Sequence, residues 1–315
     1  MAGSIPGFAL SEARTKMHTQ ESRALDSVIG LWRESIKTLK ILSRNKMGLF
    51  GFIMTILIIV ISFVGPIIWP PETSANVAEI NQGISAKHWL GTDFQGQDNL
   101  RKIVNGGKDI VTIAVVTGVL SMSIAVVVGS FSAFIGGRVD GLLMEFVNIW
   151  LTIPKFPLLA VLATVLSLKD VITLSVLMAI LDWPALARQV RSQVLSLKNR
   201  EYIEAATMLN LGTPRILFRE LLPNMMSFIA ISTIFEMTHA IYQQTGLIFL
   251  GIVPYSSSNW GVMISAAERR GVLFNPQAAW SILAPMGAIV LFQLALVSFA
   301  RSLDEVFNPR LRTGV

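Results

Sequence analysis

Cysteine is absent from this sequence, charged residues are scarce, and histidine occurs only three times in 315 residues. The absence of cysteine excludes a disulfide scaffold, thiolate catalysis and cysteine-ligated metal sites. His18, His88 and His239 lie far apart without metal-ligand spacing, so we expect no metal site. Charged residues make up 15% of the chain, whereas a soluble domain carries about 25%. With 52% hydrophobic residues and a mean hydropathy of +0.59, disorder is excluded and lipid is the expected solvent.

Long apolar runs predict an all-α membrane protein with six transmembrane helices. Residues 47–69 hold no charged side chain, and a helix needs roughly 20 residues to cross the hydrocarbon core. Further apolar runs follow at residues 109–135, 141–167, 171–190, 224–250 and 280–300. An even number of crossings places both termini on the same side of the membrane.

Positive charges are distributed unevenly between the two sides of these runs. Eighteen of the 26 Lys and Arg residues fall in segments on the same side as the termini, and seven fall in the opposite loops. Cytoplasmic loops carry the excess of cations, so both termini are predicted to be cytoplasmic. The net charge of +6 therefore fits a membrane surface, and no nucleic-acid partner is expected.

The polar segments between and beside the spans complete the predicted organisation. Apolar residues recur at helical spacing from Leu31 to Lys40 with cations between them, which predicts an amphipathic helix on the bilayer surface. The domains expected are a cytoplasmic tail 1–46, a first span 47–69, an extracytoplasmic loop 70–108, a core 109–302 and a cytoplasmic tail 303–315. Loop 70–108 is long enough to form a packed lid, although a simple tether is the alternative.

The cytoplasmic segment 199–222 inside this core reads as two short helices joined by a turn. The first runs from Lys198 to Leu209, and Asn210 and Gly212 are expected to end it because both tolerate a left-handed backbone. Thr213 is the expected N-cap of the second, with proline following it in the first turn. Two adjacent alanines in the first helix leave room for close approach by a partner.

Several residues of this segment resemble the EAA motif of ABC importer permeases. The sequence Glu204-Ala205-Ala206, a turn residue four positions later and Leu222-Pro223 carry the resemblance. In that family the loop is the coupling helix that docks on an ATPase subunit, although the family usually has glycine at the position of Asn210. The resemblance implies that the following residues couple to the ATPase: Glu204, Ala205, Ala206, Asn210, Gly212, Leu222 and Pro223.

The outer loop narrows the resemblance to one branch of the family. Residues 88–98 are similar to the signature HPLGTDxxGRD of the C-type subunit of oligopeptide and dipeptide permeases, from which Trp89 and Gln97 depart. Residues 248–251, 259–261 and 303–311 also match in family order. This resemblance implies the MetI-like fold of type I ABC importer permeases in a prokaryotic inner membrane.

Partners are likewise implied by the resemblance. They are a second homologous permease, two ATP-binding subunits, an extracytoplasmic substrate-binding protein and the lipid bilayer. ATP and Mg are expected in the ATPase subunits, with no cofactor and no catalytic residue in this chain. Residues 106–109, Gly-Gly-Lys-Asp, lack the spacer and the hydroxyl residue of a phosphate-binding loop.

Polar residues inside the spans are candidates for a pathway, because ionisable groups are rare in lipid. Four of them lie within about 60° of arc on a helix over residues 224–250. A second stripe, made by Glu145, Asn148, Thr152 and Lys155, lies next to Pro154, which should kink its helix. Lys155 is expected to pair with Glu236 or Asp182, either as a structural ion pair or as part of a pore lining. The candidates are Ser232, Glu236, His239, Gln243, Asn148, Thr152, Lys155 and Asp182.

The cargo expected from the resemblance is a peptide, with short oligosaccharides or chelated nickel as alternatives. A secondary transporter driven by an ion gradient is a competing class, but it should show inverted repeats, and none is evident. A membrane enzyme would need a convergent nucleophile, metal or acid–base set, which the sequence does not offer.

Overall fold

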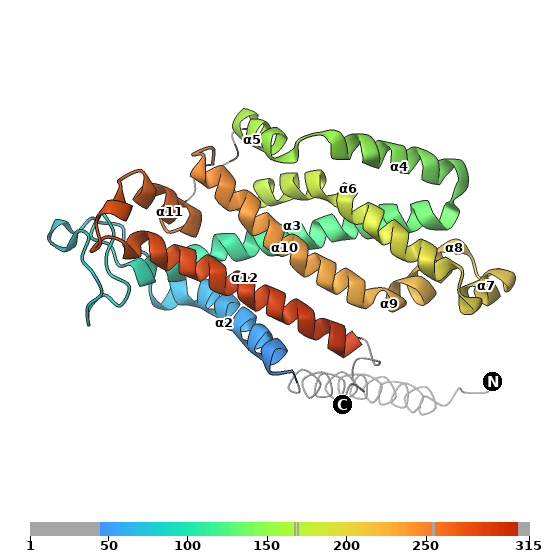
Figure 1. Cartoon of the computed structure of the whole chain (residues 1–315), viewed down its shortest axis with the longest axis horizontal. Coiled ribbons are helices and arrows are strands. Elements are labelled where there is room, and N and C mark those ends of the chain that lie inside the picture. The colour runs from blue at the N-terminus through green and yellow to red at the C-terminus, as the bar shows by residue number, and fades with distance from the viewer. Residues whose placement is uncertain (1–44, 167, 169, 254–255, 308–315) are drawn as a thin grey trace, which may run out of the picture.

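The computed structural model describes residues 45–166, 168, 170–253 and 256–307, and within them the chain is helical without a strand. The predicted amphipathic helix at residues 31–40 and the end of the C-terminal tail lie outside the described residues. Long helices run side by side, with the loops of residues 70–98 at one end and α7 and α8 at the other (Figure 1). We call residues 70–98 the cap and residues 199–222 the tip.

Four helices are each long and apolar enough to cross a membrane. They are α2 (Lys46–Ile68), α3 (Asn99–Ile135), α6 (Val171–Lys198) and α12 (Trp280–Phe307). Two bent helix pairs bring the number of candidate spans to as many as six. One pair is α4 (Gly137–Thr152) with α5 (Lys155–Val165), and the other is residues 213–224 with α10 (Met226–Phe249).

The apolar run over residues 141–167 is not one continuous helix, because the chain bends by 79° between α4 and α5. Ile153 is extended and Pro154 is the N-cap of α5. A proline disfavours the helical conformation of the residue before it and lacks the N–H that would continue the hydrogen-bond ladder. The predicted kink is therefore a complete break.

Two other spans are longer than the apolar runs that predicted them. Helix α3 begins at Asn99, where the Asp98 side chain accepts a hydrogen bond from the Arg101 N–H, so the last part of the expected loop 70–108 is helical. Helix α6 continues through charged residues to Lys198. Hydropathy marks the lipid-facing part of a helix, whereas the hydrogen-bond ladder continues beyond it.

Short elements complete the chain. The cap contains η1 (Val77–Glu79), and the tip contains α7 (Glu201–Met208), α8 (Thr213–Ile216), the π-helical turn η2 (Leu217–Leu221) and the start of α9 (Leu222–Asn224). Helix α11 (Trp260–Glu268) and η3 (Val272–Phe274) precede α12.

Helix α3 is the centre of the bundle and packs against α6 and α10. Glycines permit the close approach: a Cβ at Gly129 would lie 2.4 Å from the Ala187 carbonyl oxygen, and one at Gly118 would lie 2.7 Å from Met237 Cγ. Gly136 and Gly137 have a different role, because they form the α3–α4 turn with positive φ and almost no close neighbours.

The cap is packed by hydrogen bonds and ion pairs, so it is a folded lid rather than a tether. His88 Nδ1 lies 2.7 Å from Asp98 Oδ2, and Lys102 Nζ lies 2.6 Å from Asp93 Oδ2, and all four side chains are buried. At its surface, the hydrogen bond from Lys87 lowers the pKa of the Glu79 carboxyl. The cap thereby seals one end of the bundle over the start of α3.

Replacing Gly106 with alanine tests the close packing at this end. A Cβ there would lie 1.7 Å from the Ser258 carbonyl oxygen, a backbone atom that cannot rotate away. We expect Gly106→Ala to lower the free energy of unfolding by about 1–3 kcal/mol, measured by thermal unfolding in detergent. Gly141→Ala, inside α4 with nothing within 4 Å, is the control and should be neutral or stabilising. If both variants unfold at the same temperature, Gly106 is not closely packed against the backbone at Ser258.

Candidate functional site

The polar stripe expected on the fifth apolar run lies on α10. Glu236 and Gln243 are buried, Ser232 is half-buried, and His239 is exposed. Glu236 is the eleventh residue of this 24-residue helix, so it lies about 15 Å from the helix start, near its middle. The stripe therefore places ionisable groups far from both ends of a spanning helix.

Helix α6 brings Asp182 to this stripe, and α5 brings Lys155. Lys155 Nζ lies 3.3 Å from Asp182 Oδ1, and the Asp182 side chain is only 2% exposed. Of the two partners expected for Lys155, the structure selects Asp182. Lys155 is the first residue after the break at Pro154, so the break that hydropathy missed positions the cation against α6.

A fourth and a fifth side chain complete the group around Asp182. Gln243 Nε2 donates to Asp182 Oδ1 at 3.2 Å and lies 3.2 Å from His239 Nδ1. One ligand atom from each of Asp182, Glu236 and His239 lies within 4.8 Å of the others. We call Lys155, Asp182, Glu236, His239 and Gln243 the intramembrane cluster.

No metal site was expected, because the three histidines lie far apart in the chain. The structure nevertheless brings His239 together with two carboxylates. The sequence places His239 near one carboxylate on its own helix, and the second carboxylate comes from α6, more than fifty positions earlier. The distance between residues of different helices cannot be read from their spacing in the chain. The three side chains are of types that can ligate a cation. Among the described residues, they form the one group of three such side chains whose ligand atoms lie this close together.

Several buried oxygens of the cluster have no hydrogen-bond partner among the described residues. They are Asp182 Oδ2, Glu236 Oε1 and Gln243 Oε1. A buried polar atom without a partner typically costs about 1–3 kcal/mol. Such a cost is unusual in a packed core and is typical of a site that a ligand, an ion or a proton occupies during function.

Of the second expected stripe, Lys155 joins this cluster, whereas Asn148 and Thr152 do not. Asn148 and Thr152 are exposed on α4, and the Thr152 hydroxyl donates within its own helix to the Ile149 carbonyl. The aromatic Trp150, which the sequence analysis did not single out, makes the contact instead: its Nε1 donates to the Leu181 carbonyl at 3.3 Å, beside Asp182. The available signal was a tryptophan one helical turn after Phe146, whose ring packs against it.

The tip has the turn that its sequence predicts. Asn210 has a φ of 53° and Gly212 a φ of 76°, so both adopt positive φ, as expected at the end of α7. The N-cap of α8 is Gly212 rather than Thr213, which is already the first helical residue. Helix α9 starts at Leu222 with Pro223 in its first turn, before the chain turns by 72° into α10.

The two alanines of the tip face opposite ways, which corrects the expectation that both leave room for a partner. Ala205 and Glu204 are exposed, whereas Ala206 is 6% exposed. Ala206 packs inside the chain with Ile203, because α7 presents one face to the bundle. Close approach at Ala206 is therefore made by this chain's own helices.

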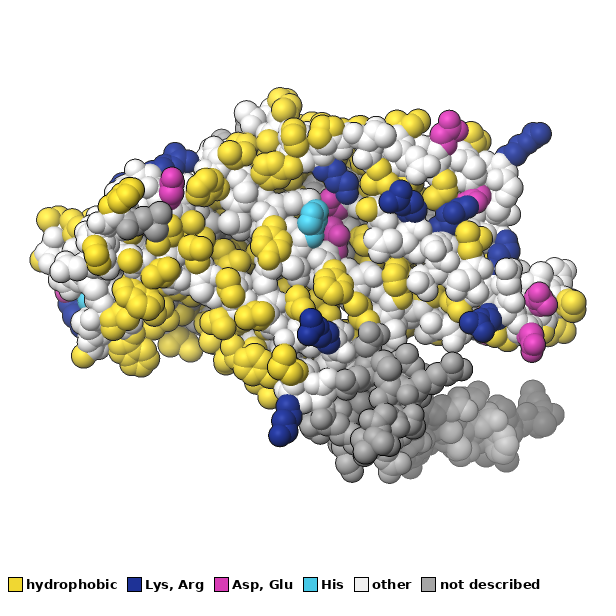
Figure 2. Space-filling model, in the orientation of Figure 1, with side chains coloured by type: hydrophobic (Ala, Val, Ile, Leu, Met, Phe, Trp, Pro, Cys, Tyr) yellow, Lys and Arg dark blue, Asp and Glu magenta, His cyan; other side chains and the backbone are white. Residues whose placement is uncertain are grey.

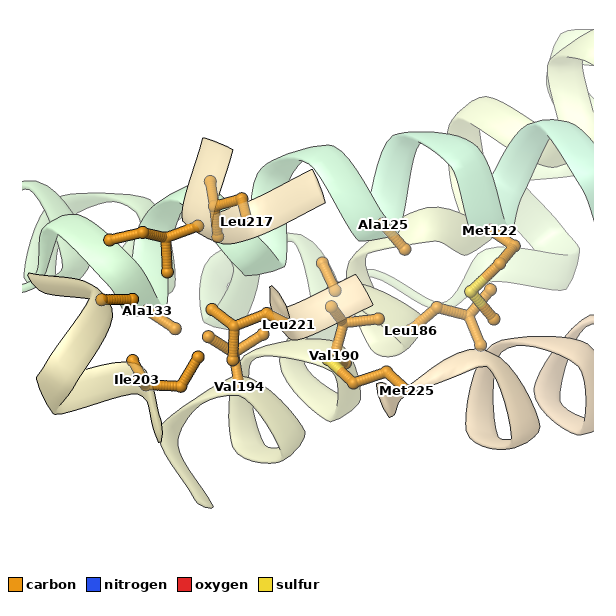
Figure 3. Packing of buried hydrophobic residues seen from close by; sticks show 13 residues of the cluster. Met122, Ala125, Ala133, Leu186, Val190, Val194, Ile203, Leu217, Leu221 and Met225 are labelled. Carbon is orange, nitrogen blue, oxygen red and sulfur yellow. The ribbon is translucent and has the colours of Figure 1, made fainter. Parts of the chain in front are cut away.

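Large apolar side chains that the sequence analysis did not assign to docking are exposed instead at the tip. Met208 is 86% exposed, Leu209 72% and Phe218 59%. Their neighbours on the inward face form the core shown in Figure 3, where Ile203, Leu217 and Leu221 meet Val190 and Val194 of α6. The tip thus exposes large apolar side chains among charged ones, over a packed apolar base.

Charged anchors hold this base to the neighbouring helices. Arg191 of α6 donates to both oxygens of Asp140 of α4 at 2.6 and 2.5 Å. Lys198 at the end of α6 donates to the carbonyls of Ala133 and Phe134 at the end of α3. A bidentate Arg–carboxylate pair fixes orientation as well as distance, so α4 and α6 are held together beside the tip.

Comparison with known proteins defines the class. Residues 125–313 match the family model of the binding-protein-dependent transport system inner membrane component, and residues 30–83 match the N-terminal TM domain of oligopeptide transport permease C. The chain therefore belongs to the binding-protein-dependent transport permeases. It is a multi-pass inner membrane permease with the MetI-like fold, as the motifs predicted.

Relatives with printed functions cover most of the chain. It is 32% identical over 270 residues to a putative peptide permease protein of Brucella suis, covering 85% of this chain and 88% of that one. It is 31% identical to the oligopeptide transport system permease protein OppC of Bacillus subtilis, covering 90% and 91%. The dipeptide transport system permease protein DppC of the same species is 28% identical, covering 94% and 92%.

Lys155→Met tests the ion pair at the centre of the cluster. It leaves the buried Asp182 carboxylate without its cation, and since Lys155 is itself partly exposed we expect a loss of about 1–3 kcal/mol in unfolding free energy. Adding Asp182→Asn should recover most of that loss, because the buried charge is then removed as well. Unfolding in detergent measures both.

The matched control is Arg138→Met, which removes an exposed cation and should be close to neutral. If the Lys155→Met variant is as stable as the Arg138→Met variant, Lys155 does not stabilise Asp182.

Proposed function

We propose that this chain is a pore-forming permease subunit of an ATP-driven, binding-protein-dependent importer of oligopeptides or dipeptides. Its partners in this proposal are a second, homologous permease, two ATP-binding subunits and an extracytoplasmic binding protein. The names of its relatives support peptides as the cargo. The observation that carries the mechanical part of the proposal is the set of exposed apolar side chains on the tip, which lies at the end of the bundle opposite the cap (Figure 1).

An exposed apolar surface at a helix turn calls for a partner. Met208, Leu209 and Phe218 lie beyond the packed helices, where lipid does not cover them if the tip is in the cytoplasm. The excess of cations on this side of the chain supports that orientation and places both termini in the cytoplasm. An ATPase subunit is the partner that the EAA resemblance of Glu204 and Ala205 implies.

Force on the tip reaches the helices of the pathway through packed contacts. Ile203 and Leu217 on the inward face of the tip contact α6. On the other side, Leu222 and Pro223 start α9, which leads directly into α10. A movement of the tip therefore shifts α6 and α10, the two helices that carry Asp182 and Glu236.

The chain itself has no catalytic role in this proposal. ATP and Mg belong to the ATPase subunits, and nucleotide drives transport by binding one arrangement of the permeases more tightly than the other. The cap is the surface offered to the loaded binding protein, and its buried ion pairs make it a stiff platform. Gly212 and Asn210 set the turn that presents the tip.

Met208→Glu tests the tip as the docking surface. The variant puts a charge at an 86% exposed apolar position, so folding should be unaffected while ATPase binding is lost. We expect at least a tenfold decrease in the amount of ATPase that co-purifies with the tagged permease, and an equal decrease in peptide uptake.

Phe274→Glu is the matched control, because Phe274 is 92% exposed but lies in η3, far from the tip along the chain. It should leave ATPase co-purification unchanged. If the Met208→Glu variant binds the ATPase as well as the wild type does, the tip is not the docking surface.

A further inference from the structure

With both carboxylates ionised, the intramembrane cluster carries one more negative charge than positive charges. Lys155 compensates Asp182, and no Lys, Arg or His of the described residues forms a salt bridge with Glu236. Both carboxylates are at least nine-tenths buried. An uncompensated charge near the middle of a spanning helix is costly, so the cluster favours a further positive charge.

The unpartnered oxygens around this excess charge suit an ammonium group. Asp182 Oδ2, Glu236 Oε1 and Gln243 Oε1 are acceptors without a donor, and an ammonium carries three donors and no acceptor. Two oxygens that each lie about 2.8 Å from one nitrogen are up to roughly 5.6 Å apart. The ligand atoms of Asp182 and Glu236, within 4.8 Å of each other, fit on either side of such a nitrogen.

Charge balance favours a monovalent cation over a metal ion at this position. A monovalent ligand brings Lys155, Asp182 and Glu236 to neutrality. A divalent ion would leave a net positive charge, and it would lie beside the Lys155 ammonium, which is already 3.3 Å from Asp182 Oδ1. Like charges in a medium of low dielectric repel strongly.

The cluster is open to one face of this chain. His239 is exposed and Lys155 is partly exposed, whereas the carboxylates lie deeper. Figure 2 shows a histidine with acidic side chains and a basic side chain beside it in the middle of a largely apolar face. A polar patch at mid-height of a lipid-spanning bundle is suited to a ligand that passes along this face.

We infer that Glu236, with Asp182 and Gln243, binds the ammonium group of the cargo during translocation. This inference rests on the proposed function and adds to it the part of the peptide that the permease recognises. The α-ammonium of a peptide is the group that fits, and it is common to every unblocked peptide. The ammonium loses its hydration when it leaves water, and Glu236 compensates for part of that loss inside the pathway.

The test uses the assembled transporter in proteoliposomes with its ATPases, second permease and binding protein. The probes are trialanine and N-acetyl-trialanine, which differ in the ammonium. We expect Glu236→Gln to lower the maximal uptake rate of trialanine about tenfold and to leave that of the acetylated peptide unchanged. The wild-type and variant transporters are assayed with the same binding protein. A change in the ratio of the two uptake rates, trialanine to N-acetyl-trialanine, is therefore due to the permease. Thr238→Val, a near-isosteric change on the same helix outside the cluster, should not change the ratio.

A second measurement separates recognition from folding. The melting temperature of the complex in detergent should not fall in the Glu236→Gln variant, since an uncompensated charge is removed. Millimolar trialanine, but not the acetylated peptide, should raise the melting temperature of the wild type and not that of the variant.

The inference is overturned if Glu236→Gln slows both peptides equally, or if it lowers the melting temperature without changing the ratio. Stabilisation by Mn²⁺, Ni²⁺ or Zn²⁺ that the variant loses, with no response to trialanine, would assign the cluster to a metal instead. Failure of the proposed function has a different signature. An assembled wild-type complex would then take up neither peptide, while the melting-temperature measurement still reports ammonium binding.

Discussion

Asp182 is a buried carboxylate in a helix that spans lipid, and the side chains around it come from neighbouring helices. Lys155 of α5 and Gln243 of α10 contact its Oδ1 atom, and Trp150 of α4 bonds to the preceding carbonyl. A charge in hydrocarbon must be compensated nearby, so this one residue constrains where three other helices lie. The break at Pro154 serves the same end, because it brings the cation to the carboxylate.

The intramembrane cluster and the tip belong to one mechanical unit. Helix α6 carries Asp182 and, about 18 Å further along its axis, Val194 in the core beneath the tip. Helix α10 carries Glu236 and starts where the tip ends. The Arg191–Asp140 pair adds α4 to the same unit. In the proposed function, a partner that displaces the tip changes the surroundings of both carboxylates, and the ATPase subunits are thereby coupled to the inferred cargo site.

The sequence predicted those features that depend on neighbours along the chain. The apolar runs identified the spanning helices, and Asn210 and Gly212 identified the turn because few residues accept positive φ. The sequence also predicted that Lys155 pairs with a carboxylate inside the membrane. Other predictions failed because they depend on direction in space: Ala206 points inward rather than toward a partner, and Asn148 and Thr152 lie away from the cluster.

By itself, then, the sequence determined that this is a helical membrane permease and to which family its motifs belong. It also determined that residues 199–222 form a helical turn between two apolar runs. These follow from hydropathy, charge and backbone preference, which act within a few residues. The tertiary structure alone decided that Lys155 pairs with Asp182 instead of Glu236, and that His239 lies beside two carboxylates. Such contacts join residues tens of positions apart, and their distances depend on how α5, α6 and α10 pack together.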